Sequence, residues 1–157
     1  VGNFPFVAMF EHFGTEEQQK EFILGGFARE RRTAFGLTEP NHGSDATHME
    51  TKAVRETRGG VSGWRIDGEK MWTTGMHVVS HVMVFARTSG KDGDATGITC
   101  FIVPREHIKI EEWMWTFNMP TDHPRVSFTN VWVPADAMFG AEGRGLRVRV
   151  TLDAIAH

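Results

Sequence analysis

The chain has 157 residues, 40% of them hydrophobic and 24% charged, with a formal net charge of −3. This is an ordinary globular composition, and the slight acidic excess without any Lys/Arg block argues against a nucleic-acid surface held by bulk charge. No apolar run reaches the roughly 20 residues of a membrane-spanning helix. Cys100 is the only cysteine and lies in an apolar run, which excludes an internal disulfide and predicts a buried, inert thiol. A reducing compartment, the cytoplasm or the mitochondrial matrix, fits this cysteine usage.

Residues 1–33 have helical periodicity, and Thr15 followed by Gln18 predicts a capping box at the start of a second helical segment. From Ala34 to Phe139, short β-prone runs alternate with turn residues. The dipeptide Asp67-Gly68 between two such runs predicts a hairpin. The predicted strands are Thr33–Thr38, Thr51–Glu56, Val61–Ile66, Glu69–Thr74, His81–Thr88, Gly97–Val103, Ile108–Ile110 and Val126–Val133.

These elements predict a mainly β fold, an open β-barrel of two packed sheets with helical segments at both ends. We expect residues 1–33 to be a helical segment, 34–140 the central β-barrel domain, and 141–157 the start of another helical domain. The periodicity of the last dozen residues fits a strand and a helix nearly equally. Neither end looks complete, so we expect a fragment of a longer protein.

Two segments carry candidate chemistry. In 35–45, a β-prone run ends at Thr38, and Pro40, Gly43 and Ser44 form a loop whose backbone N–H groups and hydroxyls could hold a polar cofactor or a phosphate. In 68–75, Trp72 precedes two threonines, and these side chains could cover and hydrogen-bond an aromatic ring. Local chemistry alone favours a plain surface turn for 35–45 and a β-strand with a core tryptophan for 68–75.

Together, the segments Thr38-Glu39-Pro40, Gly43-Ser44-Asp45 and 68–74 resemble the acyl-CoA dehydrogenase family. Further pieces resemble this family in the same order along the chain. They are 13–20, similar to its "GTEEQK" helix start, 101–104, similar to its "FIVP" element, 128–134, similar to its "F-x-x-V-x-V-P" strand, and 140–146, similar to its glycine-rich approach to a C-terminal helical domain.

The resemblance implies an acyl-CoA dehydrogenase middle-domain fold that binds FAD. Leu37 and Thr38 would contact the flavin ring, Trp72 would stack beside it, and the Thr74 hydroxyl would bond near the N5 position that receives hydride. The residues implied in cofactor binding are Phe35, Leu37, Thr38, Gly43, Ser44, Trp72, Thr73 and Thr74. Those implied in binding the acyl-CoA substrate are Ser44, Asp122 and Arg125.

The sequence departs from the family pattern in three places. The family's "W-I-T-N-G" is replaced by 72–76, in which Thr73 stands for the isoleucine and Gly75 for the asparagine. The family's "D-T-R-G" element is not clear around 121–125. The stretch 44–50, taken with the altered 72–76 element, is similar to a divergent branch of the family and leaves the acyl chain length open.

The family removes hydrogen from the α and β carbons of an acyl-CoA thioester, with a glutamate base supplied from the C-terminal helical domain. No carboxylate here matches that base, and Asp153 has no reason to take the role, so no catalytic residue is assigned. We expect the fragment alone neither to turn over nor to hold FAD tightly. Alternatives are an oxidase or monooxygenase on the same scaffold, and a non-catalytic β-barrel binding or assembly module.

The resemblance further implies an electron-transfer flavoprotein or similar acceptor as partner, and a homo-oligomer for the complete protein. A metal site is not expected, because His77 and His81 flank a β-prone run instead of sharing a helix face. Trp113 and Trp115 alternate on a predicted strand, which favours core or interface packing over ligand stacking.

Overall fold

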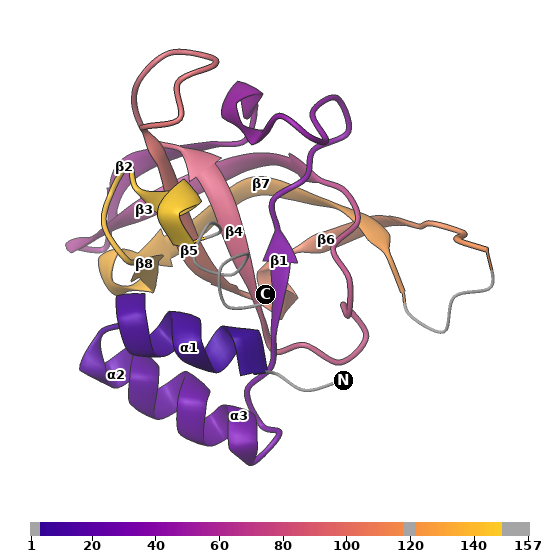
Figure 1. Cartoon of the computed structure of the whole chain (residues 1–157). Coiled ribbons are helices and arrows are strands. Elements are labelled where there is room, and N and C mark those ends of the chain that lie inside the picture. Colours follow the sequence, from indigo (N-terminus) through magenta and orange to yellow (C-terminus); the bar gives the residue numbers. More distant parts are fainter. Residues whose placement is uncertain (1–3, 118–121, 149–157) are drawn as a thin grey trace.

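The computed structural model of the chain describes residues 4–117 and 122–148 (Figure 1). The helical elements are α1 (Phe4–Phe13), α2 (Glu16–Gln19), the π-helical η1 (Lys20–Leu24) and α3 (Gly25–Phe27), with 3-10 turns η2 (Ala46–His48), η3 (Arg105–His107) and η4 (Ala135–Ala137). The strands are β1 (Thr33–Gly36), β2 (Lys52–Arg58), β3 (Val61–Lys70), β4 (His81–Arg87), β5 (Ile98–Pro104), β6 (Lys109–Trp113), β7 (Pro124–Pro134) and β8 (Met138–Phe139). Residues 145–148 are helical, so at these positions the helix, and not the strand, is the correct alternative.

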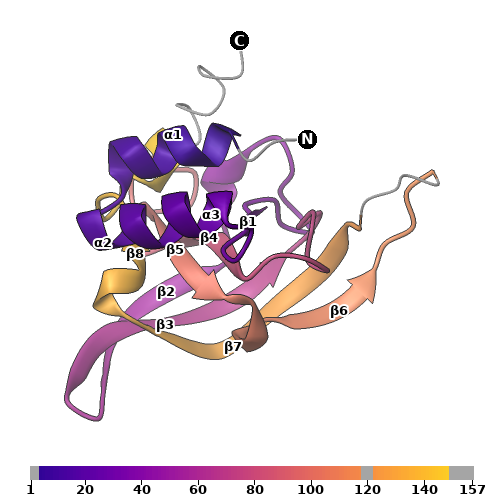
Figure 2. The ribbon, with the colours of Figure 1, turned by 90° about the horizontal axis from the view of Figure 1, so that it is seen from below.

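The strands form one strongly curled sheet with the order β6-β7-β3-β2-β4-β5-β8, and β1 pairs with β4 beside this path. The curl is visible in Figure 2, where β2, β3 and β7 lie across from β4 and β5. Strands β2 and β4 are joined through a single residue pair, Lys52 with Arg87. The sheet therefore has two layers that face each other, and the predicted mainly β, open-barrel fold is confirmed.

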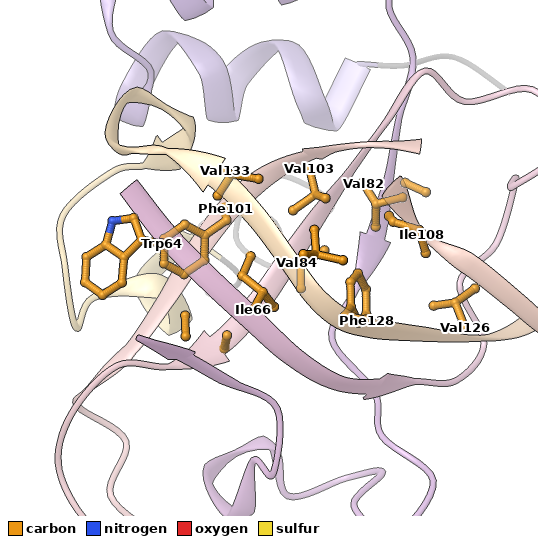
Figure 3. Close-up of a cluster of buried hydrophobic side chains, with 14 of the residues drawn as sticks. Trp64, Ile66, Val82, Val84, Phe101, Val103, Ile108, Val126, Phe128 and Val133 are labelled. Atoms are coloured by element: carbon orange, nitrogen blue, oxygen red, sulfur yellow. The ribbon is translucent and has the colours of Figure 1, made fainter. Parts of the chain in front are cut away.

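The space between the two layers is filled by apolar side chains (Figure 3). Trp64 and Ile66 of β3 face Val84 of β4 and Phe101 of β5, and the Trp64 and Phe101 rings lie 5.3 Å apart. Burial of apolar surface is the main favourable contribution to folding. The strand residues on this inner face therefore hold the curl closed.

The opposite face of β4 and β5 packs against the helices. Met83 and Phe85 point away from the inner face and join Met9 and Phe10 of α1 in a second apolar cluster. Successive side chains of a strand point to opposite faces, and both faces of these strands are buried. This explains why their sequences are nearly continuous apolar runs.

The start of α2 has the predicted capping box. The Thr15 hydroxyl accepts from the Gln18 N–H, and the Gln18 side chain accepts from the Thr15 N–H. The Gln18 amide also donates to the carbonyl oxygens of Asp136 and Met138, at 2.9 and 3.0 Å. The Gln18 side chain thus fixes the helices to η4 and to β8.

The predicted hairpin at Asp67-Gly68 is wrong. Strand β3 continues through this dipeptide to Lys70, and its register against β7 shifts there, as in a β-bulge. Gly68 has φ +151°, and a Cβ at this position would lie 2.5 Å from the Thr51 hydroxyl oxygen. The hairpin that joins β2 to β3 instead turns at Gly59 and Gly60, both with positive φ.

The separate strand predicted over Glu69–Thr74 is also wrong, because Glu69 and Lys70 end β3 and the following residues form a loop. The pair Trp113 and Trp115 does not lie on one strand, since β6 ends at Trp113. Both indole rings are exposed, so core packing within this chain is wrong for them, and packing at an interface stays a prediction.

Cys100 lies in the cluster between the sheet and the helices and is fully buried, as predicted. Burial raises the pKa of its thiol strongly. We therefore expect no reaction of the native protein with an aromatic disulfide reagent over minutes, and one equivalent of reaction per chain in denaturant. Rapid labelling of the native state would contradict this burial.

Candidate functional site

The two segments singled out in the sequence lie side by side. The Met71 N–H donates to the carbonyl oxygen of Thr38 at 2.8 Å, and the Lys70 ammonium donates to the carbonyl oxygen of Leu37 at 3.1 Å. The loop after β1 therefore runs along the end of β3. Phe35 and Leu37 direct their side chains into the cluster under the helices, where the Phe35 ring stacks on Phe85.

A buried ion pair holds this junction. The Glu39 carboxylate accepts from the Lys70 ammonium at 2.9 Å, from the Thr51 N–H at 2.9 Å and from the Glu50 N–H at 2.6 Å. Glu39 is 4% exposed and Lys70 is fully buried. Removing both charges from water is costly, so only this dense set of donors makes the pair tolerable.

The ionisation of the pair follows from its surroundings. Burial alone would raise the pKa of the Glu39 carboxyl, but Lys70 and the donors from Thr51 and Glu50 hold that pKa below its ordinary value. Burial lowers the pKa of Lys70 to about 8, against the opposite influence of Glu39. At neutral pH the junction is thus an ion pair that joins the loop, β3 and the start of β2.

The loop beyond Glu39 closes on itself and presents its tip to solvent. Glu39 and His42 exchange backbone hydrogen bonds at 3.2 Å, and the Asp45 carboxylate accepts from the Thr47 N–H at 2.9 Å. Gly43 and Ser44 between them are exposed. A Cβ at Gly43 would meet no atom within 4 Å. Nothing in the described chain therefore requires a glycine here, whereas a ligand lying on the backbone would.

The loop after β3 sorts its side chains between the interior and the surface. Trp72 has φ +62°, an uncommon conformation for a bulky residue, and its side chain is 43% exposed. Thr73 is fully buried, and its hydroxyl has no hydrogen-bond partner among the described residues. Thr74 is exposed. Of the three residues in this loop that were predicted to bind the cofactor, Trp72 and Thr74 thus reach the surface and Thr73 does not.

This loop is fastened to the segment that leads into β7. The Thr73 N–H donates to the carbonyl oxygen of Pro124 at 3.3 Å, and the Gly75 N–H donates to that of Asp122 at 3.4 Å. Between these bonds, the Thr74 hydroxyl lies 2.8 Å from His123 Nδ1. The His123 ring also meets Trp72 edge to face, with centroids 6.4 Å apart. The sequence reasoning missed His123, which no local pattern distinguishes.

A cleft of about 730 Å³ begins at this loop. Thr74, Gly75, Val78 and Val79 form one wall, and the opposite wall comes from the helices and the segment that follows them. The residues on that wall are Phe6, Val7, Phe10, Phe22, Gly26, Phe27, Arg29, Arg31, Arg32 and Thr33. The cleft is therefore lined mainly by apolar residues, together with three arginines and Thr74.

The residues predicted to bind substrate lie in separate places. Asp122 is beside Gly75, whereas Arg125 forms ion pairs with Glu69 at 3.2 Å and with Glu112 at 3.9 Å. Ser44 is on the exposed loop, and no hydrogen bond among the described residues links it to Asp122 or Arg125. The carboxylate Oδ2 of Asp122 is buried and has no described partner.

Residues 4–117 and 122–148 contain neither a candidate metal site nor a helix able to span a membrane. No cluster of His, Cys, Asp and Glu there has the arrangement of a metal site, and His77 instead stacks on Trp113 with ring centroids 4.0 Å apart. None of the helices in these ranges is long and apolar enough to cross a bilayer.

Comparison with known proteins identifies the fold. A family model described as the middle domain of acyl-CoA dehydrogenases matches residues 34–131. A short-chain-specific acyl-CoA dehydrogenase of Megasphaera elsdenii is 34% identical over 147 residues, which cover 90% of this chain and 37% of that protein. A mitochondrial 2-methylacyl-CoA dehydrogenase of Solanum tuberosum is 30% identical over 138 residues, covering 86% of this chain and 32% of that protein.

The solved structure of butyryl-CoA dehydrogenase from Megasphaera elsdenii superimposes with a TM-score of 0.83 at 29% identity, covering 93% of this chain and 38% of that one. The chain thus spans about a third of the length of these relatives. Since the family model covers more than half of its residues, the chain belongs to the acyl-CoA dehydrogenase family.

Proposed function

We propose that this chain forms the FAD-binding wall of an enzyme that dehydrogenates acyl-CoA thioesters between the α and β carbons. One observation carries the proposal: the exposed Trp72 ring and the Thr74 hydroxyl both contact His123, and Thr74 also lines a mainly apolar cleft. A flat aromatic cofactor needs a ring and a hydrogen-bond donor in this arrangement, and an acyl chain needs the cleft.

The residues present fit FAD. Trp72 can cover the flavin ring, the Thr74 hydroxyl can hydrogen-bond its edge, and the backbone of Leu37 and Thr38 is held beside them by the Glu39–Lys70 pair. Bound FAD would supply the hydride acceptor. Thr73 would support the loop from inside, because its side chain is fully buried.

The CoA part of the substrate would lie toward the exposed loop and the segment before β7. Ser44, Asp122 and Arg125 are the candidate contacts, and the orphan Oδ2 of Asp122 supports a role for that carboxylate in accepting a hydrogen bond. We place the base that removes the α proton outside the described residues, in a helical domain that begins within 141–157, and we assign 1–33 to the end of a preceding helical domain.

The electron acceptor, the oligomeric state and the compartment in this proposal are the ones that the resemblance to the family implies. The chain superimposes with a TM-score of 0.82, at 26% identity, on a solved structure from a study of the electron-transferring flavoprotein of Acidaminococcus fermentans. We propose that this protein passes its electrons to such an acceptor, forms a homo-oligomer and works in a reducing compartment.

Replacement of Gly43 by alanine tests the cofactor assignment. The new Cβ meets no atom of the described chain, so we expect the midpoint of urea unfolding without FAD to stay unchanged. In the intact protein we expect FAD affinity, measured by quenching of tryptophan fluorescence, to fall at least roughly tenfold, because the methyl group would occupy ligand space.

The matched control is Ser44→Ala, which removes a hydroxyl from the neighbouring exposed position and adds no bulk. We expect it to weaken FAD binding less than Gly43→Ala does. Unchanged FAD affinity in Gly43→Ala would refute the close approach of the cofactor to this loop. Absence of any fluorescence change on adding FAD to the wild-type protein would favour a non-catalytic binding module.

A further inference from the structure

The Thr74 hydroxyl has two polar neighbours in the described structure. Its oxygen lies 2.8 Å from His123 Nδ1 and donates to the carbonyl oxygen of Trp72 at 3.4 Å. A carbonyl oxygen can only accept a hydrogen bond, and a hydroxyl has a single proton to donate. Both contacts can therefore exist together only if His123 Nδ1 carries a hydrogen and donates it to Thr74.

The strengths of the two contacts are unequal. The contact with His123 has the length of a good hydrogen bond, whereas 3.4 Å to a carbonyl oxygen is long for a hydroxyl donor. The hydroxyl proton is therefore held weakly, and a better acceptor placed above the exposed Thr74 can take it without disturbing the bond to His123. With the opposite tautomer, the proton would point at Nδ1 and face away from a ligand.

The backbone keeps these groups in register. The bonds from Thr73 N–H to Pro124 and from Gly75 N–H to Asp122 flank Thr74 on one segment and His123 on the other. The edge-to-face contact with Trp72 further orients the imidazole ring. His123 thus reaches Thr74 from a segment 49 residues away in sequence, in a fixed geometry.

We infer that His123 is a positioning residue, which donates from Nδ1 to the Thr74 hydroxyl and thereby directs the hydroxyl proton toward an acceptor atom on the edge of the bound flavin. The inference rests on the proposed function for the identity of the ligand. The direction of the His123–Thr74 hydrogen bond does not depend on that ligand.

The first test needs no flavin. Nitrogen NMR of the intact protein with labelled histidine, assigned by the signal lost in His123→Asn, reports which ring nitrogen carries the hydrogen. We expect Nδ1 of His123 to be protonated at neutral pH. An unprotonated Nδ1 would overturn the inference even if FAD binds normally.

The second test is a double-mutant cycle on FAD binding and on the visible absorption spectrum of the bound flavin. His123→Phe keeps a ring against Trp72 but removes the donor, and Thr74→Val keeps the shape but removes the hydroxyl. We expect each change to weaken binding roughly fivefold and to shift the spectrum alike, as loss of one hydrogen bond does. The double variant should be no worse than either single variant.

His123→Asn, which retains a side-chain N–H, should recover part of the lost affinity. Additive effects of His123→Phe and Thr74→Val, or a spectral shift from only one of them, would refute the coupling between the two residues. Failure of the wild-type protein to bind FAD would instead refute the proposed function, while the NMR measurement still decides the direction of the hydrogen bond.

Discussion

Replacement of Glu39 by glutamine is expected to lower the free energy of unfolding by about 3–5 kcal/mol, because it leaves the buried Lys70 ammonium without its counter-ion. The Glu50 and Thr51 N–H groups donate to different oxygens of the carboxylate, so in glutamine one of them would face the amide NH2, which cannot accept. Urea unfolding followed by tryptophan fluorescence at neutral pH measures this loss.

The matched control is Glu50→Gln, the same substitution on a neighbour whose exposed carboxylate contacts His42 and accepts from the Asn41 amide. We expect it to change stability by less than about 0.5 kcal/mol. The double variant Glu39→Gln/Lys70→Met should recover part of the loss, since no unpaired ammonium remains. Equal effects of Glu39→Gln and Glu50→Gln would contradict the structural role of the buried pair.

The same pair has a defined pH dependence. Because the folded-state pKa of Glu39 lies below the ordinary value of 4.5, its ionised form stabilises the protein above that pH. The stabilisation is lost as the pH falls below 4.5 and through the folded-state pKa. The difference in stability between the wild type and Glu39→Gln should therefore shrink across this acidic range.

Replacement of Phe85 by alanine is the second change with a large expected effect, about 3–5 kcal/mol of lost stability. Phe85 is fully buried between the sheet and the helices, and its ring stacks on Phe35 at 5.6 Å. The cavity would remove the support of β1, whose end leads into Leu37 and Thr38. We therefore expect a lower midpoint of thermal unfolding and weaker FAD binding together.

Phe117→Ala provides the matched control, because that ring is 87% exposed. The same loss of side-chain atoms should there change stability by less than about 0.5 kcal/mol. A Phe85→Ala variant as stable as Phe117→Ala would show that the second apolar cluster does not hold the helices on the sheet.

Local chemistry was sufficient to predict most of the fold. The apolar runs of β4 and β5 identify strands buried on both faces, and Thr15 with Gln18 identifies the start of α2. It failed at Asp67-Gly68, because a dipeptide that suits a tight turn also suits a bulge. Pairing of β3 with β7 on both sides of Gly68 decided for the bulge, and that pairing is a tertiary property.

The site was predictable only in part for the same reason. Trp72 and Thr74 were assigned through the family resemblance, and their exposure is compatible with that assignment. The partners that organise them were not predictable, since Glu39 and Lys70 are 31 residues apart and Thr74 and His123 are 49 apart. Along this loop, exposed and buried side chains alternate, so the Thr73 side chain points inside while those of Trp72 and Thr74 are exposed. Matching to the family motif alone does not reveal this difference.

The most direct test of the flavin-binding wall is the visible spectrum of the intact protein reconstituted with FAD, recorded before and after anaerobic addition of acyl-CoA thioesters of several chain lengths. We expect stoichiometric FAD, and loss of the oxidised-flavin band with at least one thioester, with both effects diminished in Gly43→Ala. Failure of the wild-type protein to take up FAD would contradict the proposed site. So would Gly43→Ala and Thr74→Val variants that bind FAD as tightly as the wild type does.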